Sequence, residues 1–252
     1  MSLIKQPFGF GVGGAYQANS VRFDGSTDCF QYKTTSMTIS NGKAGTISVW
    51  LDLMGNDGAI REIVRSVGEW FEAQFNTDNK FRVRAWNGSA YAFNMYSTDT
   101  YIATDGWTHF LATWNLATGT NYMYVDSVDV LDGGSSTSDF TIDYQTTGWT
   151  NFGHNGSGGV GMWLYDGEVA DLWFDDSYMD ITDSANRLKF INGDGKPVDL
   201  GDDGSKPTGS SPILYQSKRE GEDADDFATN KGTGGDITLQ SSIADGSSSP
   251  SD

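Results

Sequence analysis

A series of short segments in which apolar and polar residues alternate constrains this fold more than any other feature. In residues 44–53 the alternation places four apolar side chains on one face and Trp50 on the other. Residues 69–76 and 80–87 flank a Thr-Asp-Asn triplet, which predicts a hairpin. Strands that recur at about ten-residue spacing between turn residues indicate a sandwich or barrel. The predicted strands are 20–25, 44–53, 69–76, 80–87, 89–96, 108–115, 121–130, 149–155 and 167–176.

The composition supports an all-β domain, and the two ends of the chain differ from it in composition. The chain has 252 residues with 32 glycines, 5 prolines and 13% aromatic residues, a mixture that favours strands and tight turns. We predict an N-terminal arm at 1–18, a sandwich at 19–183 and an extended appendage at 184–252 that wraps or projects. The appendage begins with the best helix candidate, 184–190, capped by Asp183. Its last nine residues are predicted to be mobile in isolation.

The formal net charge of −18 argues against nucleic acid as a partner, because phosphate backbones require a positive surface. The charge is uneven, since residues 166–252 carry 19 acidic and 7 basic side chains. This acidic end predicts either a solvated surface or a docking site for calcium or a basic partner. The sequence has no apolar run long enough to predict a membrane span. The first 16 residues lack the pattern of a secretion signal.

Four segments resemble, in the order of the family, the laminin-G-like branch of the concanavalin A-like jelly rolls. They are SVRFDGSTDCF (20–30), GTISVWLDL (45–53), GWTHFLATWNLATGTNYMYVDSVDV (106–130) and GEVADLWFDD (167–176). The resemblance implies an antiparallel two-sheet jelly-roll sandwich over roughly residues 20–174. The sequence departs from the family at Ser127, where the hairpin usually has glycine. Cys29 occupies an apolar strand position, which predicts a small buried thiol.

The segments 184–215 and 227–235 resemble a tail region found after jelly-roll domains in tailed-bacteriophage structural proteins. This resemblance implies a virion surface protein, either a capsid decoration protein or a tail or fibre accessory. The expected partners are other virion proteins and copies of the chain itself. The expected homo-oligomer is a trimer if it forms spikes or fibres. The sandwich would then bind host-surface glycans weakly and gain avidity from several copies.

We expect no catalytic activity, because the residues that hydrolases of this fold require are not recognisable. Glycosidases need two carboxylates that flank the scissile bond. Glu69 and Glu72, like Glu168 and Asp171, are three residues apart and would face opposite sides of an ordinary strand. One cysteine and two distant histidines fit neither a zinc site nor a nucleophile with its base. A divergent polysaccharide-cleaving enzyme remains an alternative that requires two carboxylates about 5–10 Å apart in a groove.

Exposed aromatic rings and amides are the candidate ligand-binding groups, since sugars stack on aromatic faces and bond to polar side chains. The competing interpretation is that these aromatic rings fill the core. The candidates are Trp86, Asn87, Tyr91, Trp149, His154 and Asn155.

No cofactor is required, although calcium could bind at the rim of the sandwich through carboxylates. The competing interpretation is that these aspartates belong to ordinary turns. A free, calcium-dependent carbohydrate-binding module is therefore the alternative function. The candidate ligands are Asp24, Asp28, Asp199, Asp202 and Asp203.

Overall fold

The computed structural model describes residues 16–25, 31–33, 35–66, 71–145, 148–155 and 161–252. The strands of the first sheet are β1 (Val21–Asp24), β3 (Ala44–Leu53), β8 (Trp107–Asn115), β9 (Thr120–Val125), β10 (Val128–Asp129), β15 (Asp166–Asp175), β16 (Leu214–Gln216) and β18 (Ala244–Asp245). Those of the second sheet are β2 (Gln31–Lys33), β4 (Arg61–Ser66), β5 (Phe71–Phe75), β6 (Phe81–Trp86), β7 (Tyr91–Tyr96), β11 (Ser136–Thr137), β12 (Trp149–Asn151) and β17 (Thr238–Leu239). A separate ribbon pairs β13 (His154–Asn155) with β14 (Gly161–Met162).

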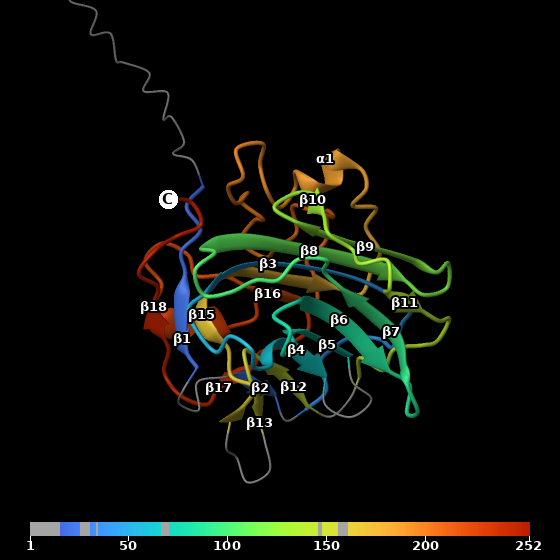
Figure 1. Cartoon of the computed structure of the whole chain (residues 1–252). Coiled ribbons are helices and arrows are strands. Elements are labelled where there is room, and N and C mark those ends of the chain that lie inside the picture. Colours follow the sequence, from blue (N-terminus) through green and yellow to red (C-terminus); the bar gives the residue numbers. More distant parts are fainter. Residues whose placement is uncertain (1–15, 26–30, 34, 67–70, 146–147, 156–160) are drawn as a thin grey trace, which may run out of the picture.

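The two sheets pack face to face, which confirms the predicted antiparallel jelly-roll sandwich (Figure 1). The first sheet has the order β10-β9-β8-β3-β15-β1-β18, with β16 also paired to β15. The second sheet has the order β11-β7-β6-β5-β4-β12-β2-β17. Strands that are neighbours in a sheet are often distant in sequence, so long-range pairing holds the fold together.

The core between the sheets is built from the inward half of each alternating strand. The Phe71 ring lies 5.3 Å from that of Trp114 and 5.4 Å from that of Phe174. Gly45 permits this packing, because a Cβ atom there would lie 2.3 Å from the Trp114 ring. Aromatic residues of both sheets thus form one continuous cluster.

The appendage wraps the sandwich instead of projecting from it. It supplies β16 and β18 to the first sheet and β17 to the second. It also contains the 3-10 helix η1 (Ala224–Ala228), which buries Phe227 in the main core. Its last residues, predicted to be mobile in isolation, are fastened here because Ser247 and Ser248 donate hydrogen bonds to the Glu168 carboxylate.

The outer face of the first sheet is covered by the beginning of the appendage. Trp173 of β15 packs there against Phe190, and its indole nitrogen donates to the carbonyl of Gly204 at 2.9 Å. Figure 1 shows the helix α1 (Ser184–Arg187) on this side of the sheet. The predicted Asp183 cap is confirmed, since its carboxylate accepts from the backbone of Ala185. A second apolar cluster therefore joins the appendage to the sandwich.

Two turns show how local chemistry supports the topology. Asn79 closes the β5–β6 hairpin with a φ of 60°, a conformation that asparagine tolerates. Asp126 and Ser127 join β9 to β10 with φ values of 48° and 66°. Ser127 thus adopts the left-handed conformation that glycine would take, so the departure from the family pattern leaves the hairpin intact. Cys29 lies outside the described residues.

Candidate functional site

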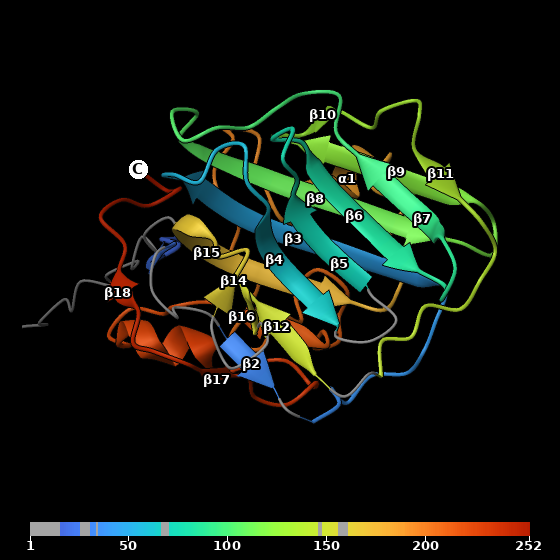
Figure 2. The same ribbon diagram turned by 60° about the horizontal axis from the view of Figure 1, so that its bottom comes forward.

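The second sheet presents a polar outer face. Strands β4 to β7 turn their apolar residues into the core, and the side chains of opposite parity point away from it. Figure 2 shows these strands side by side with β12. We call their outward side chains the polar face. Its members are Glu62, Arg65, Glu72, Gln74, Arg82, Arg84, Trp86, Tyr91, Asn94, Tyr96 and Thr150.

Cross-strand register assembles a row of alternating charge across the polar face. Thr150, Arg65, Glu72, Arg84 and Asn94 are successive partners on β12, β4, β5, β6 and β7. Arg84 donates through Nε to Glu72, and Arg65 Nη1 lies 3.4 Å from the Glu72 Oε2 atom. Opposite charges directly across neighbouring strands attract, so the row stabilises the pairing that creates it.

Glu62 lies beside this row and is completely buried. Its Oε1 atom accepts from the Thr150 hydroxyl at 2.6 Å, and its Oε2 atom lies 3.6 Å from Arg65 Nη1. Burial, assisted by the nearby charge of Glu72, raises the pKa of Glu62 to about 8 despite the opposing effects of Arg65 and Thr150. Glu62 is therefore protonated and uncharged at neutral pH.

Gln74 of β5 is the least satisfied polar residue of the polar face. It stands between Glu62 and Arg82 in the register and exposes 0% of its surface. Neither its amide nitrogen nor its amide oxygen has a hydrogen-bond partner in the described part of the chain. The same is true of the Asn94 side-chain oxygen and of Arg82 Nε. Buried polar atoms without partners are costly and often mark sites that complete their bonding with another molecule.

Aromatic rings stand beside these polar groups. The rings of Trp86 and Tyr91 are half-buried and meet edge to face, with centroids 5.0 Å apart. The Arg84 guanidinium lies 4.2 Å from the Tyr91 ring centroid, and that of Arg82 lies 5.4 Å from the Tyr96 centroid. Rings and guanidinium groups together offer stacking surface and hydrogen-bond donors, the combination that recognises sugars.

The predicted residues Trp86, Asn87 and Tyr91 come together at the β6–β7 turn. The Asn87 side-chain oxygen already accepts from the backbone of Ala90 and helps to close this turn. His154 belongs to the ribbon strand β13, which follows β12. Two strands separate β12 from β6, a distance of about 14 Å across a sheet. His154 and Asn155 belong to a separate ribbon and not to the β6–β7 turn, and ligand binding by any of these residues stays a prediction.

The proposal that Trp149 binds a ligand is wrong, because the structure places this residue in the core. Trp149 is 1% exposed, and its ring lies 5.7 Å from that of Phe174. Its indole nitrogen donates to the Asn151 side chain at 3.0 Å. The strand alternation turns Trp149 inward, so the ring is unavailable for stacking on a sugar.

The predicted calcium ligands do not converge. Asp199 is bound by Lys206 at 2.5 Å and by Arg219 at 3.2 Å, and these bonds outweigh its partial burial and lower its pKa to about 2. Asp203 accepts from the Ser211 hydroxyl at 2.6 Å, whereas the neighbouring Asp202 is fully exposed.

The remaining two calcium candidates lie near the first turn. Asp24 stands opposite Asp166 at the exposed end of β1, but Asp166 already pairs with Arg22 at 2.5 Å. Asp28 lies outside the described residues. Within the described ranges, no three Asp, Glu, His or Cys side chains are grouped to hold a metal ion. The described candidates therefore do not form a metal site, and calcium binding stays a prediction.

Glu62 and Glu72 form a carboxylate pair that the sequence did not reveal. Both approach Arg65 Nη1, so their Oε2 atoms are at most about 7 Å apart, within the range of glycosidase carboxylates. The two residues lie on adjacent strands instead of on one strand. Because every residue of β4 is buried, its sequence REIVRS shows no alternation and was not predicted as a strand.

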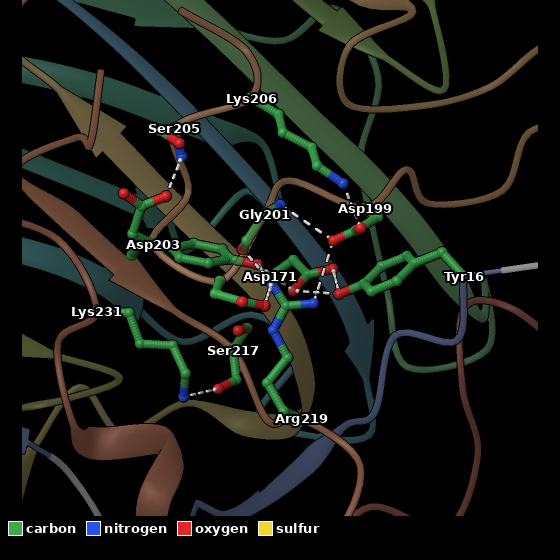
Figure 3. A network of polar contacts seen from close by, with 12 residues as sticks. Tyr16, Asp171, Asp199, Gly201, Asp203, Ser205, Lys206, Ser217, Arg219 and Lys231 are labelled. Carbon is green, nitrogen blue, oxygen red and sulfur yellow. Dashed lines mark hydrogen bonds and ion pairs between the residues drawn. The ribbon is translucent and has the colours of Figure 1, made fainter. Parts of the chain in front are cut away.

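A second polar network surrounds Asp171 on the first sheet (Figure 3). A β-bulge after Ala170 places Asp171 at a φ of 47°, where it accepts from the hydroxyls of Tyr16 at 2.9 Å and Tyr215 at 3.4 Å. Arg219 stands beside it and binds the carbonyl of Gly201. Burial raises the pKa of Asp171 to about 6, although these neighbours lower it. The network fastens residue 16 and the appendage to β15, which is a structural role.

The two packed antiparallel sheets define a jelly-roll sandwich of the concanavalin A-like kind. A model of the concanavalin A-like lectin/glucanases superfamily matches residues 12–180, and the chain belongs to this family. No curated protein sequence matches the chain. In the part of the chain that the structure describes, no helix is long and apolar enough to cross a membrane.

Two solved structures share the fold at low sequence identity. A heptameric SAP-like pentraxin from Limulus polyphemus is 11% identical with a TM-score of 0.54, over 91% of this chain and 95% of the pentraxin. A "putative carbohydrate binding protein" from Bacteroides ovatus is 14% identical with a TM-score of 0.62. That alignment covers 93% of this chain but 62% of the Bacteroides protein. At such identities the likeness establishes the fold alone.

Proposed function

We propose that this protein is a non-catalytic carbohydrate-binding domain and that the polar face is its binding surface. The observation that carries the proposal is the group of Trp86, Tyr91 and Arg84. The two rings are half-buried and in contact, and the Arg84 guanidinium lies 4.2 Å from the Tyr91 centroid. Sugar rings stack on such aromatic surfaces while their hydroxyls bond to neighbouring polar groups. Membership of a lectin and glucanase superfamily supports this function.

The carboxylate pair favours binding over hydrolysis. Glu62 and Glu72 are 0% and 1% exposed, and Arg65 lies between them. A general acid must come within hydrogen-bond reach of the leaving oxygen, and a nucleophile must reach the sugar carbon. Because Glu62 is a covered neutral acid bonded to Thr150 and Glu72 is covered and paired with Arg84 and Arg65, the domain is proposed to hold its glycan without cleaving it.

Binding is tested with the full chain on a glycan array and by calorimetry with the best ligand. Trp86→Ala is expected to weaken binding at least tenfold, because it removes the stacking ring. Trp107→Ala is the matched control: this partly buried tryptophan lies on the first sheet, so its replacement should leave binding unchanged. The proposal fails if the array shows no glycan binding, or if the two variants behave alike.

Two further measurements distinguish the proposed function from calcium-dependent binding and from hydrolysis. Binding is expected to persist in EDTA, since Glu72 is held by Arg84 and Arg65 and Glu62 is buried and neutral; loss in EDTA would favour the calcium-dependent alternative. Release of new reducing ends from a bound polysaccharide, abolished by Glu72→Gln, would indicate hydrolysis instead. Both measurements use the same ligand and the same preparation.

A virion surface is our proposal for where the domain acts, either as a capsid decoration protein or as a tail or fibre accessory. The similarity of residues 184–215 and 227–235 to segments of phage structural proteins supports it. Several copies, as in a trimer, would convert weak glycan contacts into firm attachment. Electron microscopy of purified virions with antibody labelling tests this proposal, and particles that carry no label would refute it.

A further inference from the structure

The polar face has an unusual charge balance for this chain. The protein carries a formal net charge of −18, yet the polar face contains three arginines against two carboxylic acids. Burial keeps one of these acids, Glu62, neutral, while Asp78 pairs with Arg82 at 3.3 Å, so three positive groups face the two negative charges of Glu72 and Asp78. A local excess of positive charge on an acidic protein attracts anions to that place and not to the rest of the surface.

Arg84 is the arginine best placed to use this charge. Its Nε atom donates to Glu72, whereas its two terminal nitrogens have no hydrogen bond to any described residue. The side chain is 15% exposed, and the central carbon of its guanidinium lies 4.2 Å from the Tyr91 ring centroid. A guanidinium held in this way by an ion pair and a ring offers a free two-nitrogen edge, which matches the paired oxygens of an anion.

Polar atoms without partners among the described residues lie on the row of Arg84 and on the row next to it. Within the described part of the chain, the buried side-chain oxygen of Asn94, the partner of Arg84 on β7, has no hydrogen bond, and Gln74 lacks partners at both amide atoms. Gln74 is 0% exposed, so its unmet donor and acceptor are an observation independent of the arginines. Because these atoms are covered, a ligand with hydroxyls beside its anionic group would reach them only through bridging water.

We propose that the polar face selects acidic glycans, those that carry carboxylate or sulfate groups. The terminal nitrogens of Arg84 contact the anionic group, Tyr91 holds the guanidinium, and Trp86 stacks on the adjoining sugar ring. This inference rests on the proposed carbohydrate-binding function and adds the chemical class of its ligand.

The experiment compares matched ligands with the full chain by calorimetry. Polygalacturonate is measured against its methyl ester, and chondroitin sulfate against unsulfated chondroitin. We expect the acid to bind at least tenfold more tightly than its ester, or the sulfated chain more tightly than the unsulfated one, which identifies the anion. Binding should weaken severalfold between 50 and 500 mM salt, as expected for an exposed ionic contact.

Arg84→Gln is expected to abolish the preference for the charged ligand. Arg187→Gln is the matched control. Arg187 also lies over a tyrosine, at 4.4 Å from the ring centroid of Tyr124, but this tyrosine belongs to the first sheet. Arg84→Lys keeps the charge beside Glu72 without the planar fork and should reduce the preference in part; it decides the matter if Arg84→Gln does not fold.

Three outcomes are distinguishable. Equal binding of acid and ester, and of sulfated and unsulfated chains, would overturn the inference while leaving carbohydrate binding intact. A preference that survives in both Arg84 variants would also overturn it. Failure of every glycan to bind would refute the proposed function itself.

Discussion

Replacement of the buried acid Glu62 by glutamine is expected to stabilise the protein at neutral and alkaline pH. A protonated carboxylic acid and an amide have nearly the same shape, and either can accept the 2.6 Å hydrogen bond from Thr150. The variant therefore preserves the neutral form of Glu62 and removes its titration. Because the folded pKa is raised, the stability that this group contributes is present at low pH and lost as pH rises through about 8.

The size of this stabilisation follows from the shift in the pKa of Glu62. The folded state holds its proton between the ordinary value of 4.5 and about 8, and the unfolded state does not. Each pH unit in that window costs about 1.4 kcal/mol, so by pH 7 the wild-type protein has lost up to about 3 kcal/mol at this residue. Glu62→Gln should therefore be more stable than wild type by about that amount at pH 7, and equally stable near pH 4.

The assay is urea unfolding of both proteins from pH 5 to 9, since the difference between them cancels the other titrating groups. Glu72→Gln is the control: it removes the partner of Arg84 and should destabilise the fold by several kcal/mol throughout this range. A Glu62→Gln variant that is less stable than wild type at pH 8 would refute the reasoning. It would mean that Glu62 is ionised and paired with Arg65.

Three more substitutions test the packing and the polar contacts. Gln74→Leu should raise stability by about 1–2 kcal/mol in urea unfolding, because it removes a buried amide without partners, and should weaken glycan binding. Gly45→Ala should cost at least about 1–3 kcal/mol, because its Cβ atom would lie 2.3 Å from the Trp114 ring. Replacing Ser247 and Ser248 together with alanine should cost about 2–3 kcal/mol at pH 7, since these hydroxyls donate to the Glu168 carboxylate.

The serine variants also carry a pH signature. Burial opposes ionisation of Glu168, but hydrogen bonds from Ser247 and Ser248 outweigh it and lower the pKa. The stability from this group is therefore present above the ordinary pKa and lost as pH falls through the folded one. The deficit of the double variant should shrink toward pH 3. A constant deficit, a destabilised Gln74→Leu, or a Gly45→Ala variant as stable as wild type would contradict the corresponding argument.

Strands with one buried face could be recognised from their alternation. Residues 44–53 coincide with β3, and the inward set of β6, with its outward Arg82 and Arg84, follows directly from a period of two. The hairpin turn at Asn79 and the Asp183 helix cap rest on short-range chemistry and are likewise confirmed. Each of these features depends on residues close together in the chain.

Strands buried on both faces, and contacts between distant strands, could not be predicted in this way. The strand β4 shows no alternation, and the Glu62–Glu72 pair exists only because β4 lies beside β5. The bulge at Asp171 changes which side its carboxylate faces, a shift that no spacing rule could foresee.

The sequence by itself therefore determined the fold class, most of the strands and, in the strands with clear alternation, which side chains leave the core. Only the tertiary structure decided which of those side chains meet. It turned Trp149 inward, closed the appendage over the first sheet, and left the second sheet with a polar face where Arg84 stands beside Tyr91. The physical reason is that register between strands is set by burial of the whole core, whereas alternation reports only the two faces of one strand.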